Sequence, residues 1–228
     1  MKLLPLTPEL AGSLKGRARK ISKQLQQEVT TQPAEFDTLI ILGNGDPDDR
    51  ALLVICHHLN GAKTAAITKP KYTRTAVLEH LPTYILHLKN VKNIVVILDQ
   101  EDDPLNQLNS QIERKLREKT SSHKPIHEEE RLRQYDCTLA NRNFTLTIVI
   151  NGLDTPYAEK HNIEEHLTHA ATKLNIIKPP TQKTDTKQLW TKLRQKQPQI
   201  LKTLYTQKTL CQETFPQHWK ALSKIAEK

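Results

Sequence analysis

The feature that most constrains the fold is an unbroken apolar run that ends in acidic residues. Residues 94–98 read Ile-Val-Val-Ile-Leu, and such a β-branched run is typical of a strand buried on both faces within a parallel sheet. Pro104 then starts an amphipathic helix that we predict through about Glu118. Between strand and helix lie four acids, Asp99, Glu101, Asp102 and Asp103. Ligands of open α/β sheets bind at the carboxyl ends of strands, so this loop is a candidate site.

A second buried strand, earlier in the chain, has the same ending. The apolar stretch from Phe36 to Leu42 predicts this strand, and the loop at residues 43–49 follows with the sequence Gly-Asn-Gly-Asp-Pro-Asp-Asp. The chain has only six glycines, and two lie in this loop, where they allow positive φ angles and close backbone approach. A helix is predicted over residues 50–60 and another short strand over 62–68.

Strands that alternate with helices imply parallel βαβ units with right-handed crossovers. We therefore predict an α/β fold, a Rossmann-like and mostly parallel sheet flanked by helices. If the two strands that end in acidic loops are neighbours in the sheet, their loops face each other across one crevice. The acids concerned are Asp46, Asp48 and Asp49 on one side and Asp99, Glu101 and Asp103 on the other.

Two interpretations of the acidic loops remain open. Clustered carboxylates repel one another, and a hard cation such as Mg²⁺ or Mn²⁺ relieves that repulsion. On this interpretation Asp99, Glu101 and Asp103 bind the metal ion. The alternative is a solvated strand-to-helix loop whose last acid caps the helix.

The later part of the chain continues the α/β pattern after one irregular stretch. Residues 121–133 are polar and without periodicity, and we interpret them as a mobile excursion. Strands are predicted at 135–139 and 144–150, as a hairpin that turns at residues 141–143. A helix over residues 162–174 opens with Glu164 and Glu165 in its first turn, and further helices follow to the end of the chain.

The net charge of +9 is concentrated at the two ends. The stretch from residue 178 onward carries roughly +8, the first thirty residues roughly +4, and the middle is slightly acidic. We divide the chain into a basic amphipathic helix (1–33), running from Pro8 to near residue 30, an α/β domain (36–178) and a basic helical extension (179–228). Basic ends around an acidic core suit contact with a polyanion, although lysine-rich helices are also simply soluble. The candidate nucleic-acid contacts are Lys192, Arg194, Lys196, Lys202, Arg19 and Lys20.

Several protein classes are disfavoured by what the sequence lacks. The three cysteines are far apart and match no disulfide or zinc spacing, which suits a reducing cytoplasm. No apolar run approaches the length of a membrane span. The glycine loop at 43–45 matches neither a P-loop nor a dinucleotide fingerprint, so no nucleotide cofactor is expected. We therefore expect a cytoplasmic protein, and its oligomeric state stays open.

The two acidic loops together resemble the motifs of the Toprim domain, found in topoisomerases, primases and OLD-family nucleases. That domain has a Glu-Gly-x-x-Asp loop after its first strand, to which residues 42–49 are similar, and an Asp-x-Asp motif after a later buried strand, to which Asp99 and Glu101 are similar. The OLD-like branch also has a glutamate that opens a later helix, and Glu164 is similar in position. The resemblance covers roughly residues 37–174.

This resemblance implies a Toprim-like protein that acts on or binds nucleic acid, with Mg²⁺ at the carboxylates after the central strand. The family's first glutamate, a general acid/base, falls on Asn44, and an amide cannot take up or release that proton. In a nuclease, Asp48, Asp49 or Glu164 would have to take over this role. The alternative is a Toprim-like module that binds nucleic acid or nucleoprotein without catalysis, and a small-molecule α/β enzyme ranks third.

Overall fold

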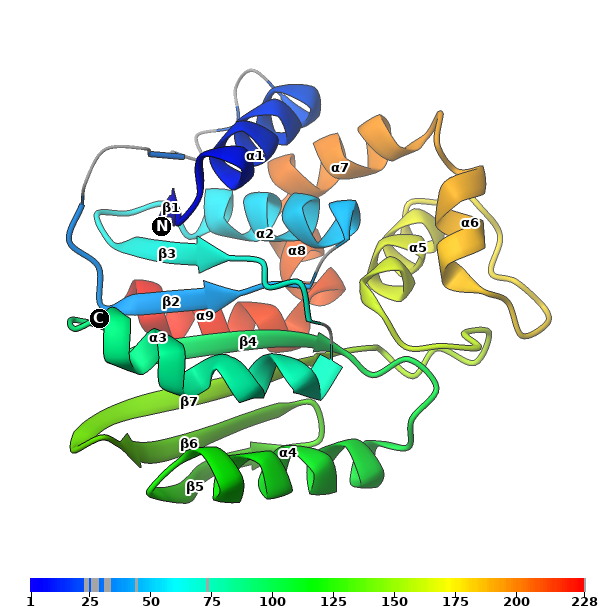
Figure 1. Cartoon of the computed structure of the whole chain (residues 1–228). Helices are drawn as coiled ribbons and strands as arrows, with labels where there is room; N and C mark the ends of the chain where they lie inside the picture. The colour runs from blue at the N-terminus through cyan, green and yellow to red at the C-terminus, as the bar shows by residue number, and fades with distance from the viewer. Residues whose placement is uncertain (23–24, 26–28, 31–33, 44, 73, 228) are drawn as a thin grey trace.

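The computed structural model describes residues 1–22, 25, 29–30, 34–43, 45–72 and 74–227. Its strands form one sheet in the order β1-β3-β2-β4-β7-β6-β5. The first five strands in this order, which are β1, β3, β2, β4 and β7, run parallel to one another. Strands β6 and β5 add an antiparallel edge to the sheet. The predicted α/β class with a mostly parallel sheet is therefore confirmed (Figure 1).

The bounds of the elements follow the chain in order. The strands are β1 (Lys2–Pro5), β2 (Thr38–Ile41), β3 (Thr64–Thr68), β4 (Asn93–Asp99), β5 (Ser122–Glu129), β6 (Leu132–Leu139) and β7 (Arg142–Asn151). The helices are α1 (Pro8–Ile21), α2 (Asp46–His58), the 3₁₀ helix η1 (Arg74–His80), α3 (Leu81–His87), α4 (Leu105–Lys119), α5 (Ile163–Lys173), α6 (Thr186–Lys192), α7 (Gln197–Thr206), α8 (Lys208–Thr214) and α9 (Pro216–Ala226).

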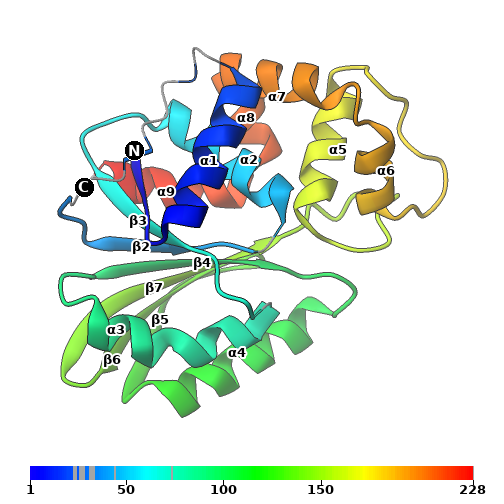
Figure 2. The same cartoon turned by 45° about the horizontal axis from the view of Figure 1, so that its top comes forward.

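The apolar run that we assigned to a central strand is β4, and it is buried on both faces. Val95 and Ile97 belong to the apolar cluster on one side of the sheet, whereas Ile94, Val96 and Leu98 belong to the cluster on the other. Successive side chains of a strand point to opposite faces, so a strand covered on both sides needs apolar residues at every position. Figure 2 shows the two layers, with η1, α3 and α4 on one face and the other helices on the opposite face.

The predicted neighbours are adjacent and parallel. Thr38 to Ile41 of β2 pair in register with Asn93 to Val96 of β4, so the two acidic loops leave the same edge of the sheet. The hairpin of β6 and β7 is also confirmed. One expectation is wrong, because residues 122–129 of the supposed mobile excursion form β5, which pairs with β6. Most of its residues are exposed, which explains why no apolar periodicity marks this edge strand.

Both terminal segments pack against the sheet. Leu10 and Leu14 of α1 share one apolar cluster with Leu201, Phe215 and Leu222 from the helices after residue 179. Helix α1 ends at Ile21, earlier than predicted, because Ser22 is extended, with φ −166° and ψ 144°. Strand β1 was not predicted and extends the parallel sheet beside β3.

Within the described residues, none of the helices combines the length and apolar character needed to cross a bilayer.

Candidate functional site

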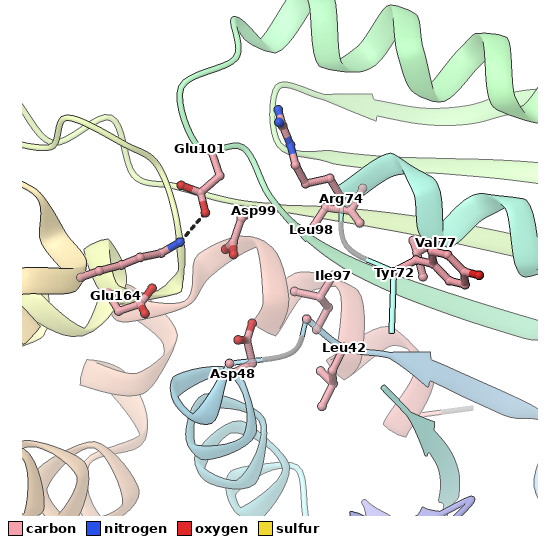
Figure 3. Close-up of a pocket in the computed structure, with 13 residues that line it drawn as sticks. Leu42, Asp48, Tyr72, Arg74, Val77, Ile97, Leu98, Asp99, Glu101 and Glu164 are labelled. Atoms are coloured by element: carbon pink, nitrogen blue, oxygen red, sulfur yellow. Dashed lines mark hydrogen bonds and ion pairs between the residues drawn. The ribbon is translucent and has the colours of Figure 1, made fainter. Parts of the chain in front are cut away.

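A pocket of about 270 Å³ opens at the carboxyl ends of β2 and β4. Its lining combines acidic, cationic, aromatic and aliphatic side chains (Figure 3). The acids are Asp48, Asp99, Glu101 and Glu164, and the other polar or aromatic lining residues are Tyr72, Arg74 and Lys187. The sheet thus brings three separate parts of the chain to one place, as the adjacency of the two strands requires.

Asp48 lies in the first turn of α2 and is buried, with 6% of its surface exposed. No hydrogen bond or ion pair joins its carboxylate to another described residue. Burial, and next the charge of Asp99, raise the pKa of Asp48 to about 8. A buried carboxyl group with no bonded cation, aimed into a pocket, is unusual, because the charge of Lys69 offsets burial only in part and the raised pKa keeps the group largely protonated near neutral pH.

The glycines before α2 make room for this carboxylate. A Cβ atom added at Gly43 would lie 3.0 Å from Oδ1 of Asp48, and one added at Gly45 would lie closer still to Oδ2. A side chain at either position would therefore displace Asp48. The two glycines let the chain pass over the carboxylate at the edge of the sheet, which extends the close-approach role predicted for them.

Asp49, a predicted catalytic residue, does not line the pocket. Its fully buried carboxylate forms ion pairs with Arg17, at 2.7 Å, and with Lys69, at 2.8 Å. Neighbouring helical residues point about 100° apart, so Asp48 and Asp49 cannot share one site. Asp49 instead joins α1, α2 and the end of β3, while Asp46 pairs with Arg17 and Arg50 at the surface.

Asp99, a predicted metal ligand, is held by neighbours on both sides. Its Oδ1 accepts a hydrogen bond of 2.8 Å from the side chain of Asn151 and one of 3.2 Å from the backbone N–H of Ile163. Burial raises the pKa of Asp99 despite these hydrogen bonds. The contacts fix the carboxylate between β7 and the start of α5.

Glu101 lines the pocket, and its carboxylate forms an ion pair with Lys187 of α6. Burial opposes the charge on Lys187, but the hydrogen bond to Glu101 and the negative charges of Glu101, Asp99 and Glu164 together outweigh burial and raise the pKa of the ammonium group. The backbone of Glu101 exchanges two hydrogen bonds, of 2.7 and 2.8 Å, with that of His161. Lys187 is a pocket residue that sequence analysis missed, since only the packing of α6 brings it there.

Asp103, the third predicted metal ligand, lies outside the pocket lining. Its carboxylate forms an ion pair with Arg74, the first residue of η1. The predicted triad of Asp99, Glu101 and Asp103 therefore does not assemble, because Glu101 adopts a left-handed backbone conformation (φ 58°) that turns the chain between them. The prediction relied on the closeness of these acids in the sequence, and the turn in the loop separates their side chains.

Glu164 enters the pocket from α5, as its position at a helix start suggested. Burial, together with the negative charge of Asp99, raises the pKa of Glu164 to about 7. The preceding Asn162 caps α5 by accepting a hydrogen bond from the N–H of Glu165. The two neighbouring acids therefore have different positions: Glu164 lines the pocket, and Glu165 does not.

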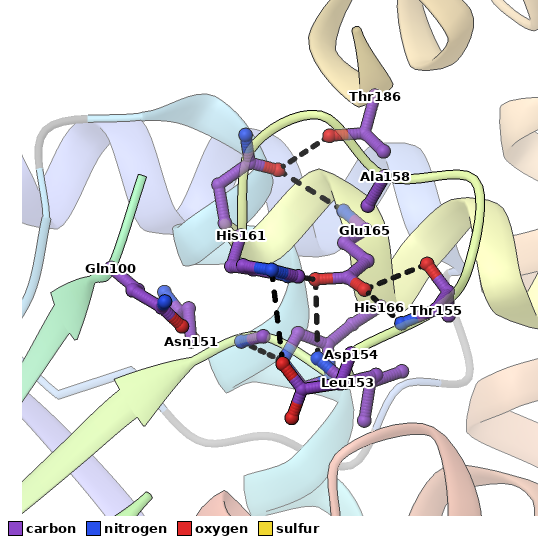
Figure 4. Close-up of polar contacts among 12 residues, drawn as sticks. Gln100, Asn151, Leu153, Asp154, Thr155, Ala158, His161, Glu165, His166 and Thr186 are labelled. Carbon is purple, nitrogen blue, oxygen red and sulfur yellow. Dashed lines mark hydrogen bonds and ion pairs between the residues drawn. The ribbon is translucent and has the colours of Figure 1, made fainter. Parts of the chain in front are cut away.

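Glu165 is fully buried and ties down the loop before α5. Its carboxylate accepts hydrogen bonds from the N–H groups of Leu153 and Thr155 and from the hydroxyl of Thr155, and it contacts Nδ1 of His161 at 2.8 Å (Figure 4). These contacts hold the pKa of Glu165 below its usual value although burial opposes this. Glu165 therefore supports the chain that carries Glu164 and the backbone partner of Glu101.

The donor set suits a cation that needs few protein ligands. Among the described residues, no group of three or more histidine, cysteine, aspartate or glutamate side chains is placed to hold a metal ion. Mg²⁺, however, keeps several water ligands and is usually bound through one or two carboxylates. The unpartnered, buried Asp48 beside Asp99 offers these carboxylates, so the residues present fit Mg²⁺ or Mn²⁺.

The predicted nucleic-acid contacts are all at the surface. Lys192, Arg194, Lys196 and Lys202 are exposed on or between α6 and α7, and Arg19 and Lys20 are exposed at the end of α1. The apolar residues between the first four, Leu193 and Leu201, are buried. The segment therefore presents its positive charge outward, as an amphipathic pattern requires.

Asn44, at the position of the Toprim glutamate, lies outside the described residues. Comparisons with protein-family models, with curated proteins and with solved structures found no match to this chain.

Proposed function

We propose that this protein is a Toprim-like, divalent-metal-dependent enzyme that hydrolyses phosphodiester bonds in nucleic acid. One observation carries the proposal: the buried carboxylate of Asp48 and the half-buried carboxylates of Asp99 and Glu164 share one pocket at the carboxyl ends of adjacent parallel strands. Asp48 has no bonded cation among the described residues. An acidic pocket would repel a phosphate unless a cation were bound between them. The site is therefore built for a metal ion together with an anionic substrate.

Each pocket residue would have a distinct part. Asp48 and Asp99 would hold Mg²⁺ or Mn²⁺, and the hydrogen bonds from Asn151 and Ile163 would keep Asp99 oriented. The ion would supply Lewis-acid stabilisation of the phosphate and an activated water. Glu164, which projects from the start of α5 into the same pocket, would accept or return the proton that Asn44 cannot carry.

Lys187 and Arg74 would neutralise charge on the phosphate. Both line the pocket, and each is held by an acid of the β4–α4 loop, Lys187 by Glu101 and Arg74 by Asp103. Donors positioned in advance stabilise developing charge without reorganisation during the reaction. Glu101 and Asp103 would thus serve as partners of these cations rather than as direct metal ligands.

The test is a nuclease assay on labelled DNA and RNA with Mg²⁺ and Mn²⁺ titrated from zero. Cleavage should require the ion, and Asp99→Ala should abolish it. Asp102→Ala is a matched control, because Asp102 lies three residues along the same loop and is exposed. Metal-dependent cleavage that survives Asp99→Ala would belong to a contaminating nuclease and would refute the proposal.

A second candidate function is a Toprim-like module that binds nucleic acid without cleaving it. The observation that favours it is Asn44, which replaces the proton-carrying glutamate of the resembling motif. Binding without cleavage at any metal concentration would select this function.

For both candidate functions, phosphate contacts by the basic residues should make the affinity for nucleic acid fall steeply with salt. The expected loss is about 0.7–0.9 log units of affinity per phosphate contact for each tenfold rise in salt concentration.

Neutralising Lys192, Arg194 and Lys196 together tests this contact surface. The slope of log affinity against log salt should become shallower by roughly 2 to 3. Fluorescence anisotropy of labelled oligonucleotides at several salt concentrations measures it. An unchanged slope would exclude these three side chains from the interface.

A further inference from the structure

The loop between β3 and η1 places an exposed aromatic ring beside the acidic pocket. Residues 69–74 read Lys-Pro-Lys-Tyr-Thr-Arg, and Tyr72 and Arg74 both line the pocket. Figure 3 shows these two side chains on the opposite side from Asp48, Asp99 and Glu164.

The ring of Tyr72 is exposed yet held in place. It is 55% exposed, one of few large apolar side chains with such exposure among the described residues. One ring face stacks on His80, with 4.5 Å between centroids and 24° between the planes. Stacking on a fixed neighbour restricts rotation of the ring and so lowers the entropy lost when a ligand contacts the rest of it.

Positive charge accompanies the ring on the same loop. Arg74 has a left-handed backbone conformation (φ 57°), which costs energy for any residue other than glycine, and its guanidinium is oriented by Asp103. Lys71 is exposed next to Tyr72. An aromatic platform between cations is the combination by which proteins bind single-stranded nucleic acid, because bases stack while cations contact phosphates.

We infer that Tyr72 stacks on an unpaired base next to the phosphate held in the pocket, so that the substrate is single-stranded nucleic acid or an unpaired end. This inference rests on the proposed function and names its substrate class. Bases inside a duplex are covered by their neighbours and must be unstacked before a side chain can reach a base face. Arg74 would contact the backbone of the same nucleotide, which fixes the strand without reading its sequence.

The experiment is fluorescence anisotropy in millimolar Mg²⁺, which keeps a cation available to the acidic pocket, with oligonucleotides whose phosphorothioate linkages resist hydrolysis. The probes are a labelled single strand, the matching duplex, and a single strand of the same length with abasic positions. The wild type should prefer the single strand. Tyr72→Leu should weaken its binding by roughly 5- to 100-fold, whereas Tyr72→Phe should stay near wild type and the abasic strand should be insensitive to either change.

Ile126→Ala is the matched control, because Ile126 is a similarly exposed apolar residue on β5 and does not line the pocket. If Tyr72→Leu binds the single strand as tightly as the wild type does, the inference is overturned. The proposed function still stands in that case, because the protein binds nucleic acid and the affinity falls with salt. Equal affinity for single strand, duplex and abasic strand also overturns it. If no probe binds even at low salt, the proposed function fails as well.

Discussion

Asp48 and Asp49 are neighbours in the sequence, yet the structure gives them opposite environments. Asp49 is completely buried between two cations, Arg17 and Lys69. Asp48 is almost as buried, but its carboxylate faces another carboxylate, that of Asp99, across a pocket. Burial alone therefore does not determine the environment of an acid. The fold supplies bonded cations to Asp49 but none, among the described residues, to Asp48.

The largest expected effect comes from removing the compensated acid. Asp49→Asn should lower the free energy of unfolding by about 3 kcal/mol, because it removes the buried carboxylate that pairs with Arg17 and Lys69 and leaves Arg17, among the described residues, only the more exposed Asp46. Partial exposure of Arg17 and Lys69, whose side chains are 24% and 14% exposed, keeps the loss at the lower end of the usual range. Urea denaturation measures it. A loss below 1 kcal/mol would mean that Asp49 does not anchor α1 and β3.

Removing the uncompensated acid should have the opposite sign. The raised pKa means that folded Asp48 binds its proton more tightly than the unfolded chain does, so its contribution to stability is lost as the pH rises from about 4 to about 8. Each pKa unit corresponds to about 1.4 kcal/mol, so the shift sets an upper limit of roughly 5 kcal/mol at pH 8. Because a buried site relaxes around a charge, we expect Asp48→Asn to raise the free energy of unfolding at pH 8, in a chelator, by about 2 kcal/mol. Near pH 4 the variant and the wild type should be equal.

The measurement is urea denaturation of both proteins at several pH values, compared as differences so that other titrating groups cancel. A variant less stable than the wild type at pH 8 would mean that the Asp48 carboxylate is compensated after all.

Metal binding should remove the charge imbalance at Asp48. Ions at ten times their dissociation constant should add about 1.4 kcal/mol to the free energy of unfolding, seen as a rise in melting temperature with millimolar Mg²⁺ or Mn²⁺. Asp99→Asn should abolish the rise, whereas Asp103→Asn should retain it because Asp103 pairs with Arg74 outside the pocket lining. A shift that depends on Asp103 and not on Asp99 would place the ion elsewhere in the loop.

The buried strands and their adjacency could be predicted because apolar patterning records burial directly. Strands β2 and β4 are apolar at nearly every position, and two such strands belong side by side at the centre of a sheet. Strand β5 could not be found in this way. It is an edge strand held by backbone pairing with β6, and exposed polar side chains carry no record of that pairing.

The site was predictable to the level of the loop, not of the side chain. Asp48, Asp99 and Glu101 line the pocket, as the acidic loops suggested, and so does Glu164, which only the resemblance to OLD-like proteins indicated. Asp49 and Asp103 do not, because a helical rotation and a left-handed residue at Glu101 decide where these carboxylates point. Lys187 lies 86 residues along the chain from its ion-pair partner Glu101, and a single sequence contains no signal for such a contact.

The smallest effect is expected at Asp46, two residues before Asp48 and 43% exposed. It shares Arg17 with Asp49 and also pairs with Arg50, but solvent screens exposed ion pairs, so Asp46→Asn should cost about 0–1 kcal/mol. Salt sharpens the contrast, because at 1 M salt the Debye length falls to about 3 Å and exposed charges are strongly screened, whereas buried pairs are screened much less. The cost of Asp46→Asn in urea denaturation should therefore vanish in 1 M salt, and that of Asp49→Asn should persist. Equal costs for the two variants at both salt concentrations would show that the shared arginine, rather than burial, sets the strength of this network.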